Sequence, residues 1–194
     1  SATSFVPQLT CDNYGHIYVV WNDRRQGLEG AYFNHSSDYG ATWQVSDIKL
    51  SNTFTGNQYT WPSNARISSD DSGRVYVTWY DWRRQLDNGH DFADIYLNFS
   101  RDFGESWQPS DVRLTSIDPR VRTDGFLYPE ISSDENGHIY IAYIDMYDYY
   151  NFYARELNFI SAYIISDAPN LASIDNQEIT EGGSLQFTVE ATDP

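Results

Sequence analysis

A stretch of thirteen residues that occurs three times constrains the fold more than any other feature of this chain. The copies are residues 11–23, 69–81 and 133–145, and their first Asp residues are Asp12, Asp70 and Asp134. Each copy contains Asp-x-x-Gly, which supplies a side-chain acceptor and a residue that tolerates positive φ, so it predicts a turn. The run that follows is rich in β-branched and aromatic residues and predicts a strand.

The predicted strands are apolar on both faces. In the first copy Ile17, Val19 and Trp21 share one face while Tyr18 lies on the other, and the later copies repeat this pattern. A short strand that is apolar on both faces is buried on both sides. The blades of a β-propeller pack face to face around an axis, which covers their inner strands twice. The repeat therefore predicts an all-β chain of stacked, similar sheets.

A second motif follows the first two copies, at equivalent positions in each. It reads Ser-x-Asp-x-Gly-x-Thr/Ser-Trp and resembles the Asp box, or BNR repeat, of sialidase-like β-propellers. In that family the box is a structural hairpin between the third and fourth strands of a blade. The chemistry agrees, because the Asp can accept turn amide hydrogens, the Gly can adopt a strained backbone and the Trp can pack beneath the fold. The matching residues are Ser36, Asp38, Gly40, Thr42 and Trp43, and Ser100, Asp102, Gly104, Ser106 and Trp107.

The two motifs together predict a partial β-propeller of three four-stranded blades within residues 1–166. The blades span about 5–51, 59–116 and 127–166. The third is degenerate, because Ala168-Pro169 follow where a third Asp box would require Gly and Trp. Strands are expected near 64–69, 74–80, 94–100 and 107–114 in the second blade, and near 156–160 in the third.

Residues 167–194 differ from the repeats and are expected to form a linker and the first strands of another module. The stretch 181–194 resembles the start of bacterial cadherin-like or Ig-like modules, which occur in large secreted or surface proteins. Two strands are too few to be stable alone. Propellers close with about four to eight blades, and sialidase-like ones have six. We therefore expect either a longer native polypeptide or completion by neighbouring copies.

Composition excludes some partners. The net charge of −16 disfavours nucleic acid and anionic membrane surfaces. No apolar run approaches the roughly 20 residues of a membrane helix, so membrane insertion is not expected. Cys11 is the only cysteine and cannot form an intrachain disulfide. The start of the chain lacks signal-peptide features, so any such peptide is expected to lie upstream or to have been removed.

The loops opposite the Asp boxes form the substrate-binding face in sialidase-like enzymes. Arginines, carboxylates and aromatic rings gather there, a combination that suits sugars. Repeated positions such as Asp23 and Asp81 have an alternative role in blade-to-blade ion pairs, whereas the tyrosines of the third blade are not repeated. The candidate ligand-binding residues are Arg24, Arg25, Asp81, Trp82, Arg83, Arg84, Asp145, Tyr147, Tyr149 and Tyr150, with Asp23, Asp91, Asp148 and Tyr153 beside them.

A catalytic set cannot be assigned, and the catalytic residues remain unknown. Where the family has Arg-Ile-Pro before its first Asp box, this chain has only Arg66-Ile67-Ser68, after the first box. Asn34 and Asn98 lie in glycosylation sequons at equivalent positions. No cofactor is expected, although the acidic pairs at 70–71 and 134–135 and Asp193 could bind calcium.

Three functions remain open at this point. The first is an extracellular or cell-surface propeller that binds carbohydrate or another ligand, or acts as a scaffold, without catalysis. The second is a fragment of a sialidase-like glycoside hydrolase whose catalytic residues lie in other blades. The third is a structural subunit of a filament or surface array, completed by further copies of itself.

Overall fold

The computed structural model describes residues 4–25, 30–52, 62–85, 91–115, 125–146 and 155–163. Every regular element in these ranges is a β-strand. The same ranges contain no helix with the length and apolar character needed to span a bilayer. The predicted tail strands and the end of the third blade lie outside the described residues.

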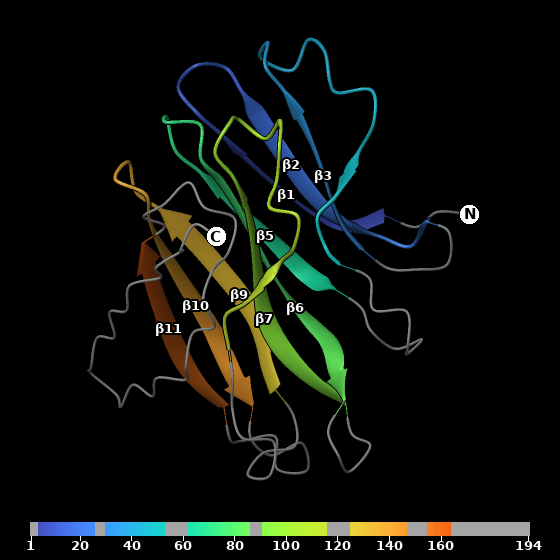
Figure 1. Cartoon of the computed structure of the whole chain (residues 1–194), viewed down its shortest axis with the longest axis vertical. Helices are drawn as coiled ribbons and strands as arrows, with labels where there is room; N and C mark the ends of the chain where they lie inside the picture. Colours follow the sequence, from blue (N-terminus) through green and yellow to red (C-terminus); the bar gives the residue numbers. More distant parts are fainter. Residues whose placement is uncertain are drawn as a thin grey trace.

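The strands form three groups that follow one another along the chain (Figure 1). We call these groups blades one, two and three. Blade one contains β1 (Ser4–Cys11), β2 (Ile17–Asp23), β3 (Gly30–Ser36) and β4 (Ile48–Lys49). Blade two contains β5 (Ser63–Ser69), β6 (Val75–Gln85), β7 (Asp91–Ser100) and β8 (Val112–Arg113). Blade three contains β9 (Gly125–Ser133), β10 (His138–Met146) and β11 (Arg155–Tyr163).

Within each blade the strands are antiparallel and follow the chain order. Blades two and three share one seven-stranded sheet, because a single parallel pair joins Ala93 of β7 to Gly125 of β9. This bridge was not expected from the sequence. The fourth strand of blade two, predicted near 107–114, has only two residues in β8, and β4 of blade one is equally short.

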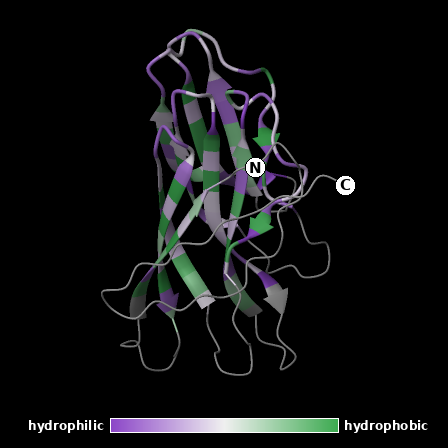
Figure 2. Ribbon diagram, turned by 60° about the vertical axis from the view of Figure 1, so that its left-hand side comes forward, coloured by the Kyte–Doolittle hydropathy of each residue, from purple (hydrophilic) through white to green (hydrophobic). Residues whose placement is uncertain are grey.

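Each blade has two faces, which we name by chain order. The leading face looks toward the preceding blade and the trailing face toward the following one. One core cluster joins the trailing face of blade one (Tyr18, Val20, Phe33) to the leading face of blade two (Val77, Trp79). A second cluster joins blades two and three in the same way. Figure 2 shows the hydrophobic residues along the strands and mostly hydrophilic turns at the upper end.

The first strands of the blades share a backbone irregularity. Val6, Asn64 and Tyr128 occupy equivalent positions in β1, β5 and β9, and all three have positive φ, at 52°, 57° and 54°. The strand register shifts at each of these sites. A non-glycine residue in this region is strained and marks a bulge that reorients a side chain. The bulge is therefore a regular feature of the first strand in all three blades.

Candidate functional site

The hairpins of a blade alternate between its two ends. The Asp-x-x-Gly turns and the Asp boxes lie at one end, which we call the turn end, toward the top of Figure 1. Residues at the end of β2, β6 and β10 and at the start of β1, β5 and β9 lie at the opposite, loop end. The two ends differ in what their polar side chains do.

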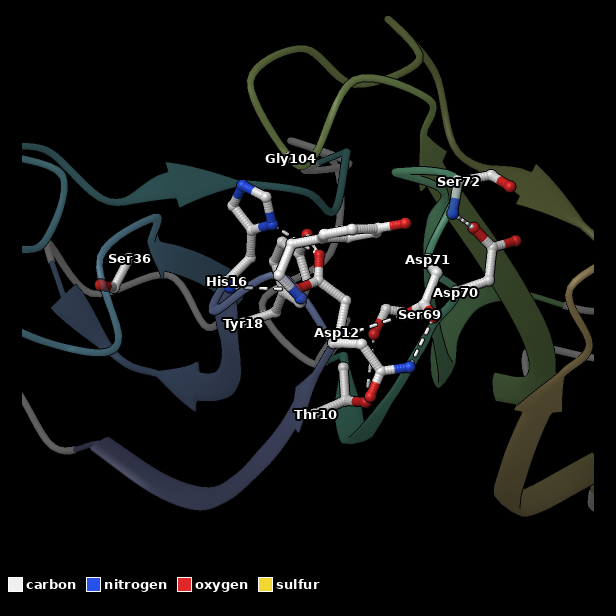
Figure 3. Close-up of polar contacts among 12 residues, drawn as sticks. Thr10, Asp12, His16, Tyr18, Ser36, Ser69, Asp70, Asp71, Ser72 and Gly104 are labelled. Atoms are coloured by element: carbon white, nitrogen blue, oxygen red, sulfur yellow. Dashed lines mark hydrogen bonds and ion pairs between the residues drawn. The ribbon is translucent and has the colours of Figure 1, made fainter.

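At the turn end, one Asp per blade organises each Asp-x-x-Gly turn. Asp12 Oδ1 accepts hydrogen bonds from the backbone N–H groups of Tyr14 and His16, at 2.9 and 3.0 Å. Asp12 Oδ2 lies 2.6 Å from His16 Nδ1 and accepts the Tyr18 hydroxyl hydrogen at 3.0 Å (Figure 3). Asp70 and Asp134 accept the same two backbone hydrogen bonds in the other two blades. Their second oxygens bind Arg74 Nε and His138 Nδ1.

The residue after each of these Asp residues connects neighbouring blades. The backbone N–H of Asn13 donates to Asp71 Oδ1 at 2.9 Å, and that of Asp71 donates to Glu135 Oε2 at 3.1 Å. The predicted calcium candidates at 70–71 and 134–135 are therefore engaged in hydrogen bonds of the fold. Within the described ranges no three His, Cys, Asp or Glu side chains come together as a metal site. Asp193 lies outside these ranges.

The two Asp boxes have the same internal hydrogen bonds. Ser36 Oγ donates to Asp38 Oδ1 at 2.8 Å and accepts from the Gly40 N–H at 2.9 Å. Thr42 donates to Asp38 through both its N–H and its hydroxyl, and its hydroxyl bond is the main reason that the pKa of Asp38 falls to about 2. In blade two, Ser100, Asp102, Gly104 and Ser106 repeat these bonds. All these bonds stabilise the turn.

The two box tryptophans have different surroundings. Trp107 packs edge-on against Phe33 of blade one, with ring centroids 4.7 Å apart, and its Nε1–H donates to the Gly104 carbonyl at 3.1 Å. Trp43 has no described blade before it and is 44% exposed. The same residue type thus joins two blades at one position and is solvent-exposed at the other.

At the loop end, blade two contains a buried ion-pair cluster that we call the clamp. Asp81 accepts from the N–H, Nε and Nη2 of Arg83, at 2.9, 2.9 and 2.6 Å. Arg83 also donates to both carboxylate oxygens of Asp111, at 2.9 Å each, and its guanidinium lies 3.9 Å from the Tyr96 ring centroid. Burial alone would lower the pKa of Arg83, but the bonds to Asp111 and Asp81 outweigh it and raise that pKa.

Blade one contains the same clamp at equivalent positions. Arg25 donates to Asp23 at 2.7 Å and to Asp47 at 2.6 Å, and its guanidinium lies 4.2 Å from the Tyr32 ring centroid. Asp23 also accepts from Ser4 Oγ and Trp21 Nε1. The hydrogen bond from Arg25 is the main reason that the pKa of Asp23 falls to about 2.

The clamps join strands within one blade, whereas the sequence predicted ion pairs between blades for these positions. Asp23, Arg25, Asp81 and Arg83 are therefore engaged in hydrogen bonds that join strands of one blade. Asp47 and Asp111 were not predicted, although both stand in Ser-Asp-(Ile/Val)-(Lys/Arg)-Leu segments at equivalent positions of the two blades. That recurrence was the available signal.

Blade three has no such clamp among its described residues. Asp145 is buried at the position of Asp23 and Asp81. Asn158 pairs with Tyr143 as Tyr96 pairs with Trp79, so an amide stands where the clamp has its tyrosine ring. The predicted Tyr147, Tyr149 and Tyr150, with Asp148 and Tyr153, lie outside the described residues. So do the side chains of Arg84 and Asp91, while Arg24 lies exposed after β2.

An aromatic cluster lies at the loop end between blades two and three. The Tyr80 ring contacts Tyr128 edge-on at a centroid distance of 5.8 Å and Trp82 edge-on at 6.4 Å. Tyr128, at the bulge of β9, is 50% exposed. Trp82 was a predicted site residue, but Tyr80 and Tyr128 were not. The missed signal is that both positions depart from the repeat, since Tyr80 corresponds to Asn22 and Tyr128 to Val6 and Asn64.

This departure has a structural reason. In blade one, Asn22 Nδ2 donates to the Pro62 carbonyl at 2.7 Å and Asn22 Oδ1 accepts from the Ala65 N–H at 3.3 Å. The equivalent of Ala65 in blade three is Pro129, which has no N–H to donate. The polar link between blades one and two is thus replaced by an aromatic contact between blades two and three.

Both sequon amides are bonded inside the fold. Asn34 Nδ2 donates to the Gln44 carbonyl and to Asp47 Oδ1, at 3.1 and 2.8 Å. Asn98 is buried, and its Nδ2 donates to the carbonyls of Leu50 and Gln108. A glycan needs this nitrogen to be accessible, so the folded geometry argues against glycan attachment at either site.

The fold resembles that of solved carbohydrate-active propellers. A Hadza microbial sialidase, Hz136, aligns with a TM-score of 0.61 and 14% identity over 81% of this chain and 35% of its own. An endo-arabinase from Bacteroides thetaiotaomicron aligns with a TM-score of 0.51 and 16% identity over 84% of this chain and 57% of its own. A Trypanosoma rangeli sialidase in complex with the inhibitor DANA aligns at 0.50 and 12% identity, over 80% and 30%.

These similarities establish the propeller fold that sialidases and arabinanases share. The chain spans only about a third to somewhat over half of the length of these proteins. No family model matches the sequence. No curated protein matches it either.

Proposed function

We propose that this protein is an extracellular or cell-surface propeller that binds carbohydrate at its loop end, without catalysis. The observation that carries the proposal is the aromatic cluster of Tyr80, Trp82 and Tyr128, which departs from the repeat and leaves one ring half exposed. Aromatic faces bind the apolar C–H faces of sugar rings, and a few placed polar groups fix the orientation. The propeller folds of sialidases and arabinanases support a glycan ligand.

Polar groups beside the cluster favour a neutral sugar over an acidic one. Glu130 lies two residues after Tyr128 and is exposed, and its Oε1 accepts from Arg66 Nε at 2.8 Å. Arg66 is thereby paired, so it is less suited to gripping a ligand carboxylate, while Glu130 retains acceptor capacity for hydroxyl groups. The net charge of −16 further disfavours anionic ligands.

The proposal is tested by titrating the purified chain with arabino-oligosaccharides and with sialyllactose, with binding followed by calorimetry and NMR. We expect the neutral oligosaccharide to bind and sialyllactose to bind more weakly. The informative variant is Tyr128→Asn, because Asn64 occupies the equivalent bulge at nearly the same φ. Loss of one stacking ring, worth roughly 1 kcal/mol, should weaken binding several-fold.

Tyr39→Asn is the matched control. Tyr39 is also an exposed tyrosine with positive φ, at 59°, but it lies at the turn end. The Tyr39→Asn variant should bind the oligosaccharide as tightly as the unmodified chain does. No binding of either sugar, or equal losses in the two variants, would contradict the proposed site.

The competing function, a fragment of a sialidase-like hydrolase, is distinguished by turnover. The same titrations are followed for released monosaccharide over hours. Binding without release supports a binding module, whereas sustained release from either sugar would show a glycosidase. The fold alone supports both, since the solved propellers it resembles include hydrolases.

A further inference from the structure

The leading face of blade one repeats a surface that is buried elsewhere in the molecule. In blade two, Val75, Val77 and Trp79 of this face are fully buried against blade one, and Ile67 and Trp107 pack beside them. The equivalent residues of blade one are only partly buried or exposed, and Leu9, the equivalent of Ile67, is 68% exposed. The affected residues are Leu9, Ile17, Val19, Trp21 and Trp43.

The trailing face of blade three shows the converse. In blade two, Tyr76, Ile95 and Leu97 of this face are buried against blade three. Their equivalents Tyr140, Leu157 and Phe159 are exposed, Phe159 by 52%. The described part of the chain therefore ends in two different apolar faces. Each resembles one half of an interface that the molecule already makes twice.

We infer that the leading face of blade one binds the trailing face of blade three of a second copy of this chain. The occupant follows from continuity with the internal interfaces, in which a leading face packs on a trailing face at equivalent positions. Two copies supply six blades, which lies within the range of four to eight at which propellers close. Each copy then contributes one leading and one trailing face, so two copies of this chain make two identical interfaces.

Polar positions at the turn end fit the same register. Inside the chain, the N–H of Asn13 donates to Asp71 and that of Asp71 donates to Glu135. At the proposed interface the equivalent donor is the backbone N–H of Glu135 of one copy. The equivalent acceptor is the side-chain amide oxygen of Asn13 of the second copy. Among the first strands, Thr10 and Ser69 bond across blades one and two, and Ser68 and Ser133 across blades two and three. The equivalent positions at the new interface are Ser132 and Cys11 of the second copy, so this hydroxyl pair is not repeated there.

The experiment measures the mass of the intact chain by light scattering and sedimentation from about 1 to 100 µM, in salt of physiological strength that screens repulsion between acidic copies. We expect a reversible dimer of the 22.4 kDa chain. Leu9→Arg damages only the leading face, and Phe159→Arg damages only the trailing face. Each variant alone should be monomeric, because every interface would then contain one damaged face.

An equimolar mixture of the two variants is the decisive sample. Phe159→Arg retains an intact leading face and Leu9→Arg an intact trailing face, so the mixture should form a 1:1 heterodimer held by one interface. Val45→Arg is the matched control, because Val45 is exposed and its equivalent Pro109 remains exposed in blade two. It should dimerise as the unmodified chain does.

Other outcomes overturn the inference. A monomer at all concentrations would do so, as would dimerisation of either face variant alone, which would mean that like faces pair. A mixture that stays monomeric although both variants retain the strand spectrum of the unmodified chain would also do so. Circular dichroism shows whether each variant retains its strands. If a variant fails to fold, the concentration dependence of the mass of the unmodified chain still tests the inference.

Discussion

The clamps of blades one and two are each built from two Asp, one Arg and one Tyr at equivalent positions but lie in different surroundings. Arg83 is 14% exposed and Asp111 only 4%, because blade one covers the leading face of blade two. The equivalent Arg25 and Asp47 are 33% and 25% exposed, because no described blade covers blade one. Bond lengths are similar in the two clamps, but Arg25 makes two side-chain hydrogen bonds to carboxylates where Arg83 makes four. The comparison therefore combines the effect of a neighbouring blade with that of the additional bonds.

The difference shows that the energetic weight of a repeated motif depends on what covers it. An ion pair in water contributes little, since screening and side-chain entropy offset the attraction. A buried carboxylate that loses its cation is costly, because nothing replaces the lost interaction. The same sequence motif should therefore contribute less to stability in blade one than in blade two, provided that the chain is monomeric during the measurement.

The largest predicted effect is that of removing the clamp arginines. Arg83→Met should lower the free energy of unfolding by about 3–5 kcal/mol, because Asp81 and Asp111 each lose two hydrogen bonds from the guanidinium in a buried site. Arg25→Met should cost less, about 1–2 kcal/mol, because Asp47 is 25% exposed and can be hydrated, while the buried Asp23 keeps Ser4 and Trp21 as donors. Urea unfolding at low micromolar protein measures both.

Arg24→Met, at the exposed position beside Arg25, controls for the loss of positive charge from an acidic chain. Equal losses in Arg83→Met and Arg25→Met would show that coverage by blade one does not determine the weight of the clamp. At concentrations where two copies associate, the cost of Arg25→Met should rise, because the leading face of blade one is then covered.

The next largest contrast is between the two Asp-box tryptophans. Trp107→Ala should cost about 2–3 kcal/mol, because the ring packs on Phe33 and its N–H is bonded to Gly104. Trp43→Ala should cost less than about 1 kcal/mol in the monomer, because this residue is already 44% exposed. The measurement is again the unfolding midpoint and slope. A larger loss for Trp43 than for Trp107 would reverse the comparison.

The box glycines give a smaller contrast. Gly40 and Gly104 both have positive φ, at 84° and 87°, so alanine is strained at either position by about 1 kcal/mol. A Cβ on Gly104 would also lie 2.6 Å from Cζ of the buried Phe33, whereas one on Gly40 would meet only Ile17 Cδ1 at 3.4 Å. Because an extra methyl group in a filled core forces its neighbours to shift, Gly104→Ala should cost about 1–2 kcal/mol more than Gly40→Ala. Thermal unfolding of the two variants measures this difference, and equal losses would mean that Phe33 moves aside without cost.

Local turn chemistry explains why much of the fold was predictable from the sequence. Asp12 and Asp70 with their glycines, and the two Asp boxes, form hydrogen bonds among residues at most four positions apart. The alternating residues of β6 likewise indicate burial on both faces. Such signals depend only on neighbours in the chain. For this reason the β-strands, the Asp-x-x-Gly turns and the Asp-box hairpins could be predicted from the sequence.

The site was less predictable, because its contacts join residues far apart in the chain. Arg83 meets Asp111, and Tyr80 meets Tyr128, only once the sheets have formed. Trp82 was correctly placed at the loop end, but repetition alone did not show that Asp81 and Arg83 are engaged in a clamp. The aromatic cluster could have been suspected from the departures of Tyr80 and Tyr128 from the repeat.

The smallest predicted effect concerns the acid sensitivity of the clamp in blade one. The folded pKa of Asp23, about 2, lies below its ordinary value of 3.8. Ionised Asp23 therefore stabilises the fold at pH values above about 4, and this contribution is lost as the pH falls toward 2. Asp23→Asn should lower stability by about 1 kcal/mol at neutral pH, and the difference from the unmodified chain should vanish near pH 2. Ser4→Ala, which removes a weaker donor to the same carboxylate, should show a smaller loss with the same pH dependence. A deficit in Asp23→Asn that stays constant from pH 5 to pH 2 would mean that packing, and not the charge held by Arg25, accounts for the role of Asp23.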